Sequence, residues 1–372
     1  MAAPLAGVRI IELGTQTPGK QCTCLLGDLG AEVIRIERPG PSAPLSDEDL
    51  VLNRNKVSVM LDLRLPAARE AVLGLCEHAD VLLEGYRPGV AARLRLGYDD
   101  VRAVNPRLVY CSLTSFGQDS PLASLPAFDI VTQGHAGLLL LQPAGDVPRA
   151  PSVYLADVCG SLMAAIGILS ALSARERSGE GQYVDVSMLD GLLWWFAGLL
   201  GPQALQGHGP GGGEDHPGYT AYETADHRWL ALGVFRPQSW STLCALLGHH
   251  EFNASFAAGS DTLRSIREAF SAKLRTRPLS EWLPLFAEND VEAGPCNTLA
   301  AAFQSDHVRA RNMVLDALNA AGEVLRQVGI PLKFSEDPGS PPRPAPLPGQ
   351  DTETVLAGLG YGQAEIRQIR GQ

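Results

Sequence analysis

Short apolar runs rich in β-branched residues alternate with helical patterns through the first half of the chain, and this alternation most constrains the fold. Strand patterns occupy residues 8–13, 33–37, 57–61, 81–84 and 108–113, with a further one at 183–186. Helical patterns lie between them, such as residues 18–30, which begin with Pro and end with Gly. Strands and helices that alternate at this spacing predict βαβ units and a parallel sheet. We therefore expect residues 1–200 to form a large, Rossmann-like, doubly wound α/β domain.

The second half of the chain has a different composition. Residues 201–218 are rich in Gly, Pro and His, so they are predicted to be a linker. Two strand patterns and four helical patterns follow, which predict a smaller α+β domain over residues 219–329. The tail, residues 330–372, holds a Pro-rich stretch and a last helical pattern, and we expect it to complete the large domain. A length of 372 residues suits two domains.

Charge and local context argue against several classes of protein. The formal net charge is −11 with no basic and aromatic cluster, so neither nucleic acid nor a membrane is expected as a partner. The seven cysteines are scattered without metal-ligand spacing, so reduced thiols and no metal are expected. The one G-x-G-x-x-G match, at 207–212, follows no predicted strand, so no nicotinamide cofactor is expected. No signal peptide is visible at the N-terminus, and a cytoplasmic location is predicted.

Asp157 stands where a long apolar helical pattern begins, and its local sequence admits two interpretations. An Asp at this place caps the helix in many proteins, because its carboxylate accepts hydrogen bonds from free backbone N–H groups. Alternatively, a carboxylate held ionised by the helix dipole among apolar side chains is a competent nucleophile or base. The local sequence leaves both interpretations open.

Arginines recur at the ends of predicted strands. Arg38, Arg87 and Arg93 follow strands, and Arg54 precedes one. Ligands of open α/β sheets bind beyond the carboxyl ends of the strands, where several arginines would suit a multiply phosphorylated ligand. For any single arginine, a surface salt bridge is the competing interpretation.

Motifs along nearly the whole chain resemble those of the class III (CaiB/BaiF-type) coenzyme A transferases. This family includes formyl-CoA transferase, carnitine CoA-transferase and α-methylacyl-CoA racemase. The matching segments are PLAGVRI (4–10), GDLGAEVIRIERPG (27–40), NRNK (53–56), LDL (61–63), GYRPG (85–89), YCSLTSFGQ (110–118), GEGQYVDVSM (179–188), EAGPCNT (292–298) and GQDTE (349–353).

The resemblance implies an interlocked, ring-like homodimer whose active site lies between the large domain of one chain and the small domain of the other. It implies that Asp157 is the catalytic aspartate and that CoA or an acyl-CoA is a substrate. The positions that match CoA-holding residues are Arg38, Leu61, Tyr86, Arg87 and Arg93.

In the transferases of the family, the aspartate attacks an acyl-CoA to form a mixed anhydride and then an enzyme-bound CoA thioester, which a carboxylic acid resolves. The resemblance suggests that Asp129 positions the nucleophile, that Gly211 and Gly212 shield the anhydride, and that Arg236 binds a substrate carboxylate. We therefore expect a CoA-transferase that uses a small-molecule acyl-CoA and a carboxylate.

Racemases of the family need a His where this chain has Phe128, and a Glu where it has Arg236. A phenyl ring carries no proton, which favours the transferase. Two alternatives remain: α-proton chemistry (racemisation or epimerisation of an acyl-CoA) with Asp157 as a single base, and a CoA-ester binding protein without transfer activity.

Overall fold

The computed structural model describes residues 3–40, 45–140, 149, 151–204, 216–318, 322–336 and 343–369. The chain divides into two compact units. Unit 1 comprises Met1–Leu199 and Asn312–Gln372, and unit 2 comprises Leu200–Arg311. Gly211 and Gly212 lie outside the described residues, so their predicted role is not addressed by the structure.

Unit 1 is built on a parallel six-stranded sheet of order β3-β2-β1-β4-β5-β6. Its strands are β1 (Arg9–Leu13), β2 (Glu32–Glu37), β3 (Lys56–Met60), β4 (Val81–Glu84), β5 (Val109–Thr114) and β6 (Tyr183–Ser187). The parallel α/β sheet predicted from the alternation is therefore confirmed. The strand order changes direction between β1 and β4, and ligands of such sheets bind beyond the carboxyl ends at this switch point.

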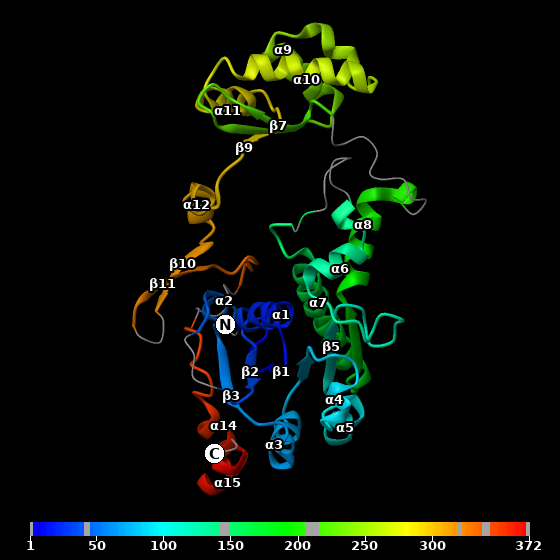
Figure 1. Cartoon of the computed structure of the whole chain (residues 1–372). Coiled ribbons are helices and arrows are strands. Elements are labelled where there is room, and N and C mark those ends of the chain that lie inside the picture. Colours follow the sequence, from blue (N-terminus) through cyan, green and yellow to red (C-terminus); the bar gives the residue numbers. More distant parts are fainter. Residues whose placement is uncertain are drawn as a thin grey trace. The chain divides into compact units, whose positions relative to one another are not determined.

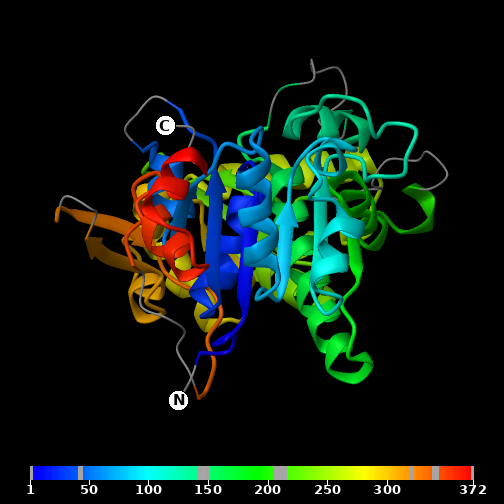
Figure 2. The same ribbon diagram turned by 90° about the horizontal axis from the view of Figure 1, so that it is seen from below.

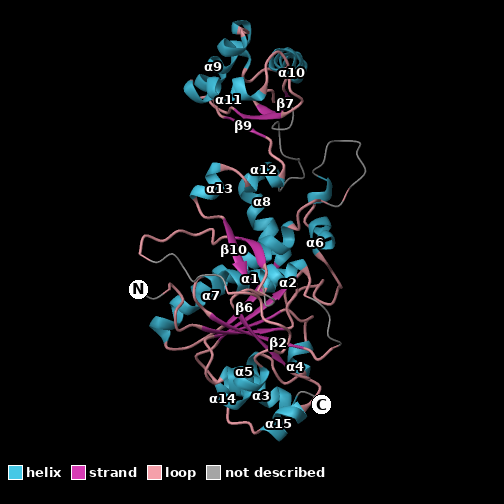
Figure 3. Cartoon of the chain, turned by 90° about the vertical axis from the view of Figure 1, so that its left-hand side faces the viewer, coloured by secondary structure: helices cyan, strands magenta, loops and turns pink. Residues whose placement is uncertain are grey.

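Apolar side chains cover both faces of the sheet, because successive residues of a strand point to opposite sides. Ile11 and Leu13 belong to one core cluster, and Ile10 belongs to the other. Figure 3 shows helices on both faces of the strands. The first face carries α3 (Pro66–Cys76), α5 (Tyr98–Val104), α14 (Thr352–Gly358) and α15 (Gln363–Ile369), and the second carries α1 (Thr17–Asp28) and α7 (Leu155–Ser178).

Helix α7 is long and apolar enough to cross a membrane by length and composition alone. In this structure it packs against α1, β5 and β6, and Ala164 and Ile168 are fully buried. One side of α7 thus forms part of the core of unit 1.

The C-terminal segment of the chain closes the outer edge of the sheet. The backbone N–H of Ser58 in β3 donates to Asp351 Oδ2 at 2.9 Å, and that of Met60 donates to Thr352 Oγ1 at 2.9 Å. Figures 1 and 2 show α14 and α15 beside the first strands of the chain. Further helices are α2 (Asp47–Leu52), α4 (Val90–Arg93), α6 (Asp129–His135) and α8 (Met188–Ala204), and the last residues of α8 belong to unit 2.

An antiparallel hairpin corrects one predicted domain boundary. Its strands β10 (Val314–Leu318) and β11 (Val324–Val328) belong to unit 1, although the sequence placed residues up to 329 in the small domain. The buried Gln327 side chain donates from Nε2 to the carbonyl oxygen of Leu50 at 3.2 Å, which attaches the hairpin to α2.

Unit 2 packs helices on a small antiparallel sheet, β7-β8-β9. Fully buried Trp240, Phe270, Trp282 and Phe286 dominate its core. Its elements are β7 (Tyr219–Glu223), β8 (Trp229–Gly233), α9 (Pro237–Leu247), α10 (Ser260–Leu274), α11 (Leu279–Glu288), β9 (Ala293–Pro295), α12 (Leu299–Phe303) and α13 (Asp306–Ala310).

A buried ion-pair network joins the first three strands of unit 1. Glu12 of β1 lies 2.8 Å from Lys56 Nζ of β3 and 2.7 Å from Arg35 Nη1 of β2. Its carboxylate also accepts hydrogen bonds from Thr15 at 2.5 Å and Thr23 at 2.6 Å. Burial alone would raise the pKa of Glu12, but the charges of Lys56 and Arg35 lower it to about 2. The carboxylate therefore stays ionised inside the protein.

We predict that Lys56→Met destabilises the protein by up to about 3–5 kcal/mol, because it removes one of the two cations, Lys56 and Arg35, that balance the buried charge of Glu12. Denaturant unfolding of the full chain measures this loss, and Arg9→Gln, at the exposed Arg9–Glu32 pair, is the control with an expected loss of about 0–1 kcal/mol. Equal losses of stability in Lys56→Met and Arg9→Gln would contradict the structural role assigned to the Lys56–Glu12 pair.

The stability of the protein should also depend on the ionisation of Glu12. Its pKa in the folded state lies below the ordinary value of 4.5, so its stabilising contribution is present above pH 4.5 and is lost as the pH falls towards 2.

Candidate active site

Two adjoining cavities open in unit 1 near the carboxyl ends of the central strands. The larger has a volume of about 930 Å³ and the smaller about 170 Å³. Both are lined by the turn after β1, the turn after β4 and the segment before α6. The shared lining residues are Thr15, Gln16, Gly85, Tyr86, Arg87, Ala127 and Phe128. The two cavities therefore meet along one continuous surface at the switch point of the sheet.

The larger cavity brings together four of the five residues that the sequence assigned to CoA. Arg38, Leu61, Tyr86 and Arg87 all line it. The fifth, Arg93, is exposed at the end of α4 and does not line the cavity, whereas its neighbour Leu94 does. Arginines at the mouth of a concave site are suited to bind phosphate groups.

For two other arginines, Arg64 and Arg54, the structure differs from the ligand site predicted from the sequence. Arg64 lines the larger cavity, although sequence reasoning missed it, and its guanidinium is held 2.6 Å from Asp62 Oδ2. Its place just beyond the end of β3, like that of Arg38 beyond β2, is the signal that would have found it. Arg54, in contrast, is buried and forms an ion pair with Asp28 at 2.6 Å, so its role is structural.

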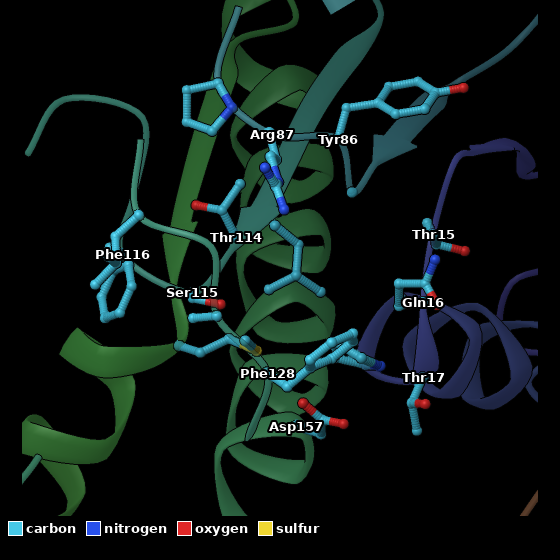
Figure 4. Close-up of a pocket in the computed structure, with 18 of the residues that line it drawn as sticks. Thr15, Gln16, Thr17, Tyr86, Arg87, Thr114, Ser115, Phe116, Phe128 and Asp157 are labelled. Atoms are coloured by element: carbon cyan, nitrogen blue, oxygen red, sulfur yellow. The ribbon is translucent and has the colours of Figure 1, made fainter. Parts of the chain in front are cut away.

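The smaller cavity contains Asp157 in the first turn of α7. Figure 4 shows the Asp157 carboxylate beside Phe128, with Arg87 approaching from the opposite side. Phe128 precedes α6, lines both cavities and is 80% exposed. The turn after β1 contributes Gln16 and Thr17, which the sequence analysis did not single out. Their position between the first strand and first helix of a parallel sheet is the signal for them.

Asp129, and not Asp157, supplies the cap at the start of α7. Asp129 Oδ1 accepts hydrogen bonds from the backbone N–H groups of Ala156 at 2.8 Å and Asp157 at 3.2 Å. The N-cap residue itself is Tyr154, which makes no side-chain capping bond. Gln133 Nε2 donates to Asp129 Oδ2 at 2.5 Å and holds this carboxylate in place. The side chain of Asp157 is therefore not used for capping, which answers the question that the local sequence left open.

The surroundings of Asp157 raise the pKa of its carboxyl group. Burial is the largest cause, and the negative charges of Asp129 and Glu48 add to it, so that the pKa rises from 3.8 to about 6. At neutral pH most of the carboxyl groups are still ionised. A carboxylate with a raised pKa is also a stronger base and nucleophile than an ordinary one.

Arg236 lies in unit 2, at the start of α9. Its Nε donates to Glu292 Oε1 at 2.8 Å, and its Nη2 lies 3.7 Å from Asp290 Oδ2. The guanidinium therefore already has carboxylate partners within its own unit. Among the described residues, no group of three or more His, Cys, Asp or Glu side chains is arranged to hold a metal ion.

The structure is thus an α/β protein with two adjoining cavities at the switch point of a parallel sheet, one lined by several arginines and the other containing a carboxylate in the first turn of a helix. Residues 5–352 match the model of one protein family, CoA-transferase family III, so the chain belongs to this family.

Relatives in this family carry out more than one reaction. The chain is 31% identical to the human alpha-methylacyl-CoA racemase, over 98% of this chain and 96% of that protein. It is 32% identical to the acetyl-CoA:oxalate CoA-transferase of Acetobacter aceti, over 91% and 92% of the two chains. A crystal structure of a CAIB/BAIF family protein from Brucella suis superposes with a TM-score of 0.81 at 29% identity and covers 96% of this chain and 100% of that one.

We predict that Asp129→Asn lowers the pKa of Asp157 below about 6, because the substitution removes a neighbouring negative charge and keeps an oxygen that accepts the capping bonds. Carbon-13 NMR titration of the Asp157 carboxyl measures the shift. Asp129→Ala additionally removes the cap, with an expected loss of about 0.5–2 kcal/mol of stability. An unchanged pKa in Asp129→Asn would show that Asp129 has no electrostatic effect on Asp157.

Proposed function

We propose that this protein is a CoA-transferase that moves CoA from an acyl-CoA to a carboxylic acid, with Asp157 as the nucleophile. The observation that carries the proposal is the position of Asp157, a half-buried carboxylate whose cavity continues into a larger one lined by Arg38, Arg64 and Arg87. A long ligand with phosphates at one end and a reactive carbonyl at the other matches this arrangement.

CoA occupies the larger cavity in this proposal. Arg38 and Arg64 follow neighbouring strands and bind its phosphates, with Arg93 at the rim. Leu61 and Tyr86 provide apolar contact for the adenine or the pantetheine arm. Arg87, which lines both cavities, lies where the arm passes towards Asp157.

In the proposed reaction, CoA is transferred by nucleophilic attack at acyl carbons. The Asp157 carboxylate attacks the thioester carbonyl, the C–S bond breaks, and CoA leaves as a thiolate while a mixed anhydride forms. The thiolate attacks the Asp157 acyl carbon, which releases the first carboxylate and leaves an enzyme–CoA thioester. The acceptor carboxylate attacks this thioester, which expels the thiolate and forms a second mixed anhydride. The thiolate then attacks the acceptor's acyl carbon, so that the new acyl-CoA forms and Asp157 leaves as a free carboxylate.

Phe128 supports transfer over two-base racemisation. Its ring lies in the cavity beside Asp157 and offers no proton donor or acceptor. Because a racemase is among the relatives, α-proton chemistry with Asp157 as base is the second candidate.

We predict that hydroxylamine added during turnover converts Asp157 to a hydroxamate, because the anhydride and the enzyme thioester are both acyl donors. Peptide mass spectrometry locates the product. Asp157→Asn should form no adduct and lose at least about a thousandfold in transfer rate. Transfer should also decline as the pH falls through about 6, where Asp157 becomes protonated.

The competing reaction has its own readout in deuterated water. The racemase-type alternative predicts that deuterium enters the α-carbon of an acyl-CoA and that this exchange is lost in Asp157→Asn. If this exchange occurs without CoA transfer to any acid and without a hydroxamate, the alternative replaces the proposal.

We further propose that the chain forms an interlocked homodimer. Exposed large apolar side chains on α8 support a second copy: Leu193 is 48% exposed, Trp194 73% and Trp195 47%. On α7, Leu162 and Ile166 are 46% and 55% exposed. Apolar surface of this extent marks a protein interface in many proteins.

We predict a dimer by light scattering that persists on dilution to nanomolar concentration. Co-refolding Asp157→Ala with Arg236→Ala should restore part of the activity if each site takes groups from both chains, because one hybrid site then carries neither substitution. A fully active monomer would exclude the assembly, and the Asp157 variant refolded alone is the control.

A further inference from the structure

Glu84, the last residue of β4, carries a buried carboxyl group that the proposed mechanism does not use. It is 3% exposed and lines neither of the two cavities. Its register partner on β1, Leu13, and the residue two positions before it, Leu82, are fully buried. An apolar side chain would therefore suit this place in the sheet. Because burial of a carboxyl group is unfavourable unless hydrogen bonds offset it, the bonds that Glu84 makes indicate its role.

The carboxyl group of Glu84 binds the turn that follows its own strand. Its Oε2 accepts a hydrogen bond from the backbone N–H of Tyr86 at 2.7 Å. Its Oε1 accepts a hydrogen bond from Oγ of Ser112, the register partner on β5. Gln118 Nε2 donates to the same Oγ at 2.6 Å. Both carboxyl oxygens of Glu84 thus have partners, and one of these bonds attaches the turn after β4 to the sheet.

The surroundings of Glu84 differ from those of Glu12, which is also buried in the sheet. Burial raises the pKa of Glu84, the negative charge of Asp185 adds to the rise, and the hydrogen bonds from Ser112 and Tyr86 offset only part of it. At Glu12, in contrast, the charges of two cations outweigh the effect of burial. Glu84 therefore acts on its neighbours through hydrogen bonds and not as half of an ion pair.

The turn after β4 carries two residues that line both cavities, Tyr86 and Arg87. Their side chains leave the turn in different directions (Figure 4). The turn also lies close to the turn after β1: a Cβ atom added at Gly14 would overlap the ring of Tyr86, and one added at Gly85 would lie 3.2 Å from the Cα of Thr15. A shift of the Tyr86 backbone would therefore move side chains in the cavities and disturb the neighbouring turn.

We propose that Glu84 is a positioning residue for CoA: its carboxyl group fixes the backbone of Tyr86 and thereby sets the direction in which Tyr86 and Arg87 meet the ligand. This inference rests on the proposed function in one respect, since it takes CoA as the ligand of the larger cavity. All the contacts that carry it lie within unit 1. Side chains that are already held in the binding geometry lose less conformational freedom when the ligand binds, so affinity rises.

Two variants of equal side-chain length test the hydrogen bond. Glu84→Gln keeps an oxygen that can accept from the Tyr86 N–H group, whereas Glu84→Met has none. Calorimetry with CoA itself measures binding without any acyl transfer. We expect the Kd of Glu84→Gln to stay within about threefold of the wild-type value and that of Glu84→Met to rise about tenfold or more. Wild-type affinity in Glu84→Met would overturn the proposal, and so would an equal loss in Glu84→Gln.

A core variant on the same strand controls for a general loss of stability. Leu83 precedes Glu84, is fully buried and belongs to the cluster on the opposite face of the sheet. Leu83→Ala should therefore lose stability but bind CoA within about threefold of the wild type. If it weakens binding as much as Glu84→Met, the proposal fails. Glu84→Leu, which resembles the leucines beside it, is the second apolar variant in case Glu84→Met does not fold.

A double-mutant cycle tests whether Glu84 acts through the turn. In a protein that already carries Tyr86→Ala and Arg87→Ala, the side chains that Glu84 positions are absent. Glu84→Met should then weaken CoA binding by about threefold or less, because interacting residues have non-additive effects. A further tenfold loss in this background would show that Glu84 acts by another route and would overturn the proposal.

The binding experiment also separates this inference from the proposed function. If CoA binding depends on Glu84 as expected but no Asp157 hydroxamate ever forms, the transferase mechanism fails and the positioning role stands. If the hydroxamate forms and Glu84→Met binds CoA like the wild type, only the positioning role fails. Absence of CoA binding by the wild-type protein would overturn both.

Discussion

The buried carboxylate of Glu12 is the interaction on which the site of this protein depends. It binds Lys56 and Arg35, which lie on the two strands beyond its own, and it accepts a hydrogen bond from Thr15 in the turn that follows. That turn continues into Gln16, which lines both cavities. A network in the sheet therefore fixes the backbone of the turn that lines both cavities. Buried ion pairs of this kind contribute little net stability, but removal of one partner is costly, so they fix geometry.

The two aspartates near the start of α7 have different roles. Asp129 accepts the backbone N–H groups at the start of α7, and Asp157, in the first turn, keeps its side chain for the cavity. Had Asp157 been the cap, its lone pairs would have been directed at the helix backbone. Burial is the main cause of the raised pKa of Asp157, and repulsion from the charge of Asp129 adds to it.

The sequence predicted the sheet well, because parallel strands buried on both faces have a strong local signature, as at 33–37 and 81–84. It misplaced the β10–β11 hairpin, whose attachment depends on the contact of Gln327 with Leu50, 277 positions away. The arginines show the same limit. Arg38 and Arg54 both stand beside a predicted strand. Arg54 is buried by its ion pair with Asp28 on α1, whereas Arg38 lines the larger cavity. The resemblance to a known family was enough to propose Asp157 as a catalytic residue. That its side chain does not cap α7 could not be predicted, because the cap is the carboxylate of Asp129, 28 positions away.

The attachment of residues 351 and 352 to β3 has a consequence for biosynthesis. The face of the sheet that carries α3 is completed by Leu356, Ile366 and Ile369, so its core stays partly uncovered until these residues have left the ribosome. The 112 residues from Leu200 to Arg311 form a contiguous unit and can fold first. Termination of synthesis before residue 351 would therefore leave a chain with a folded small unit and a large unit that still exposes one apolar face, which chaperones and proteases recognise.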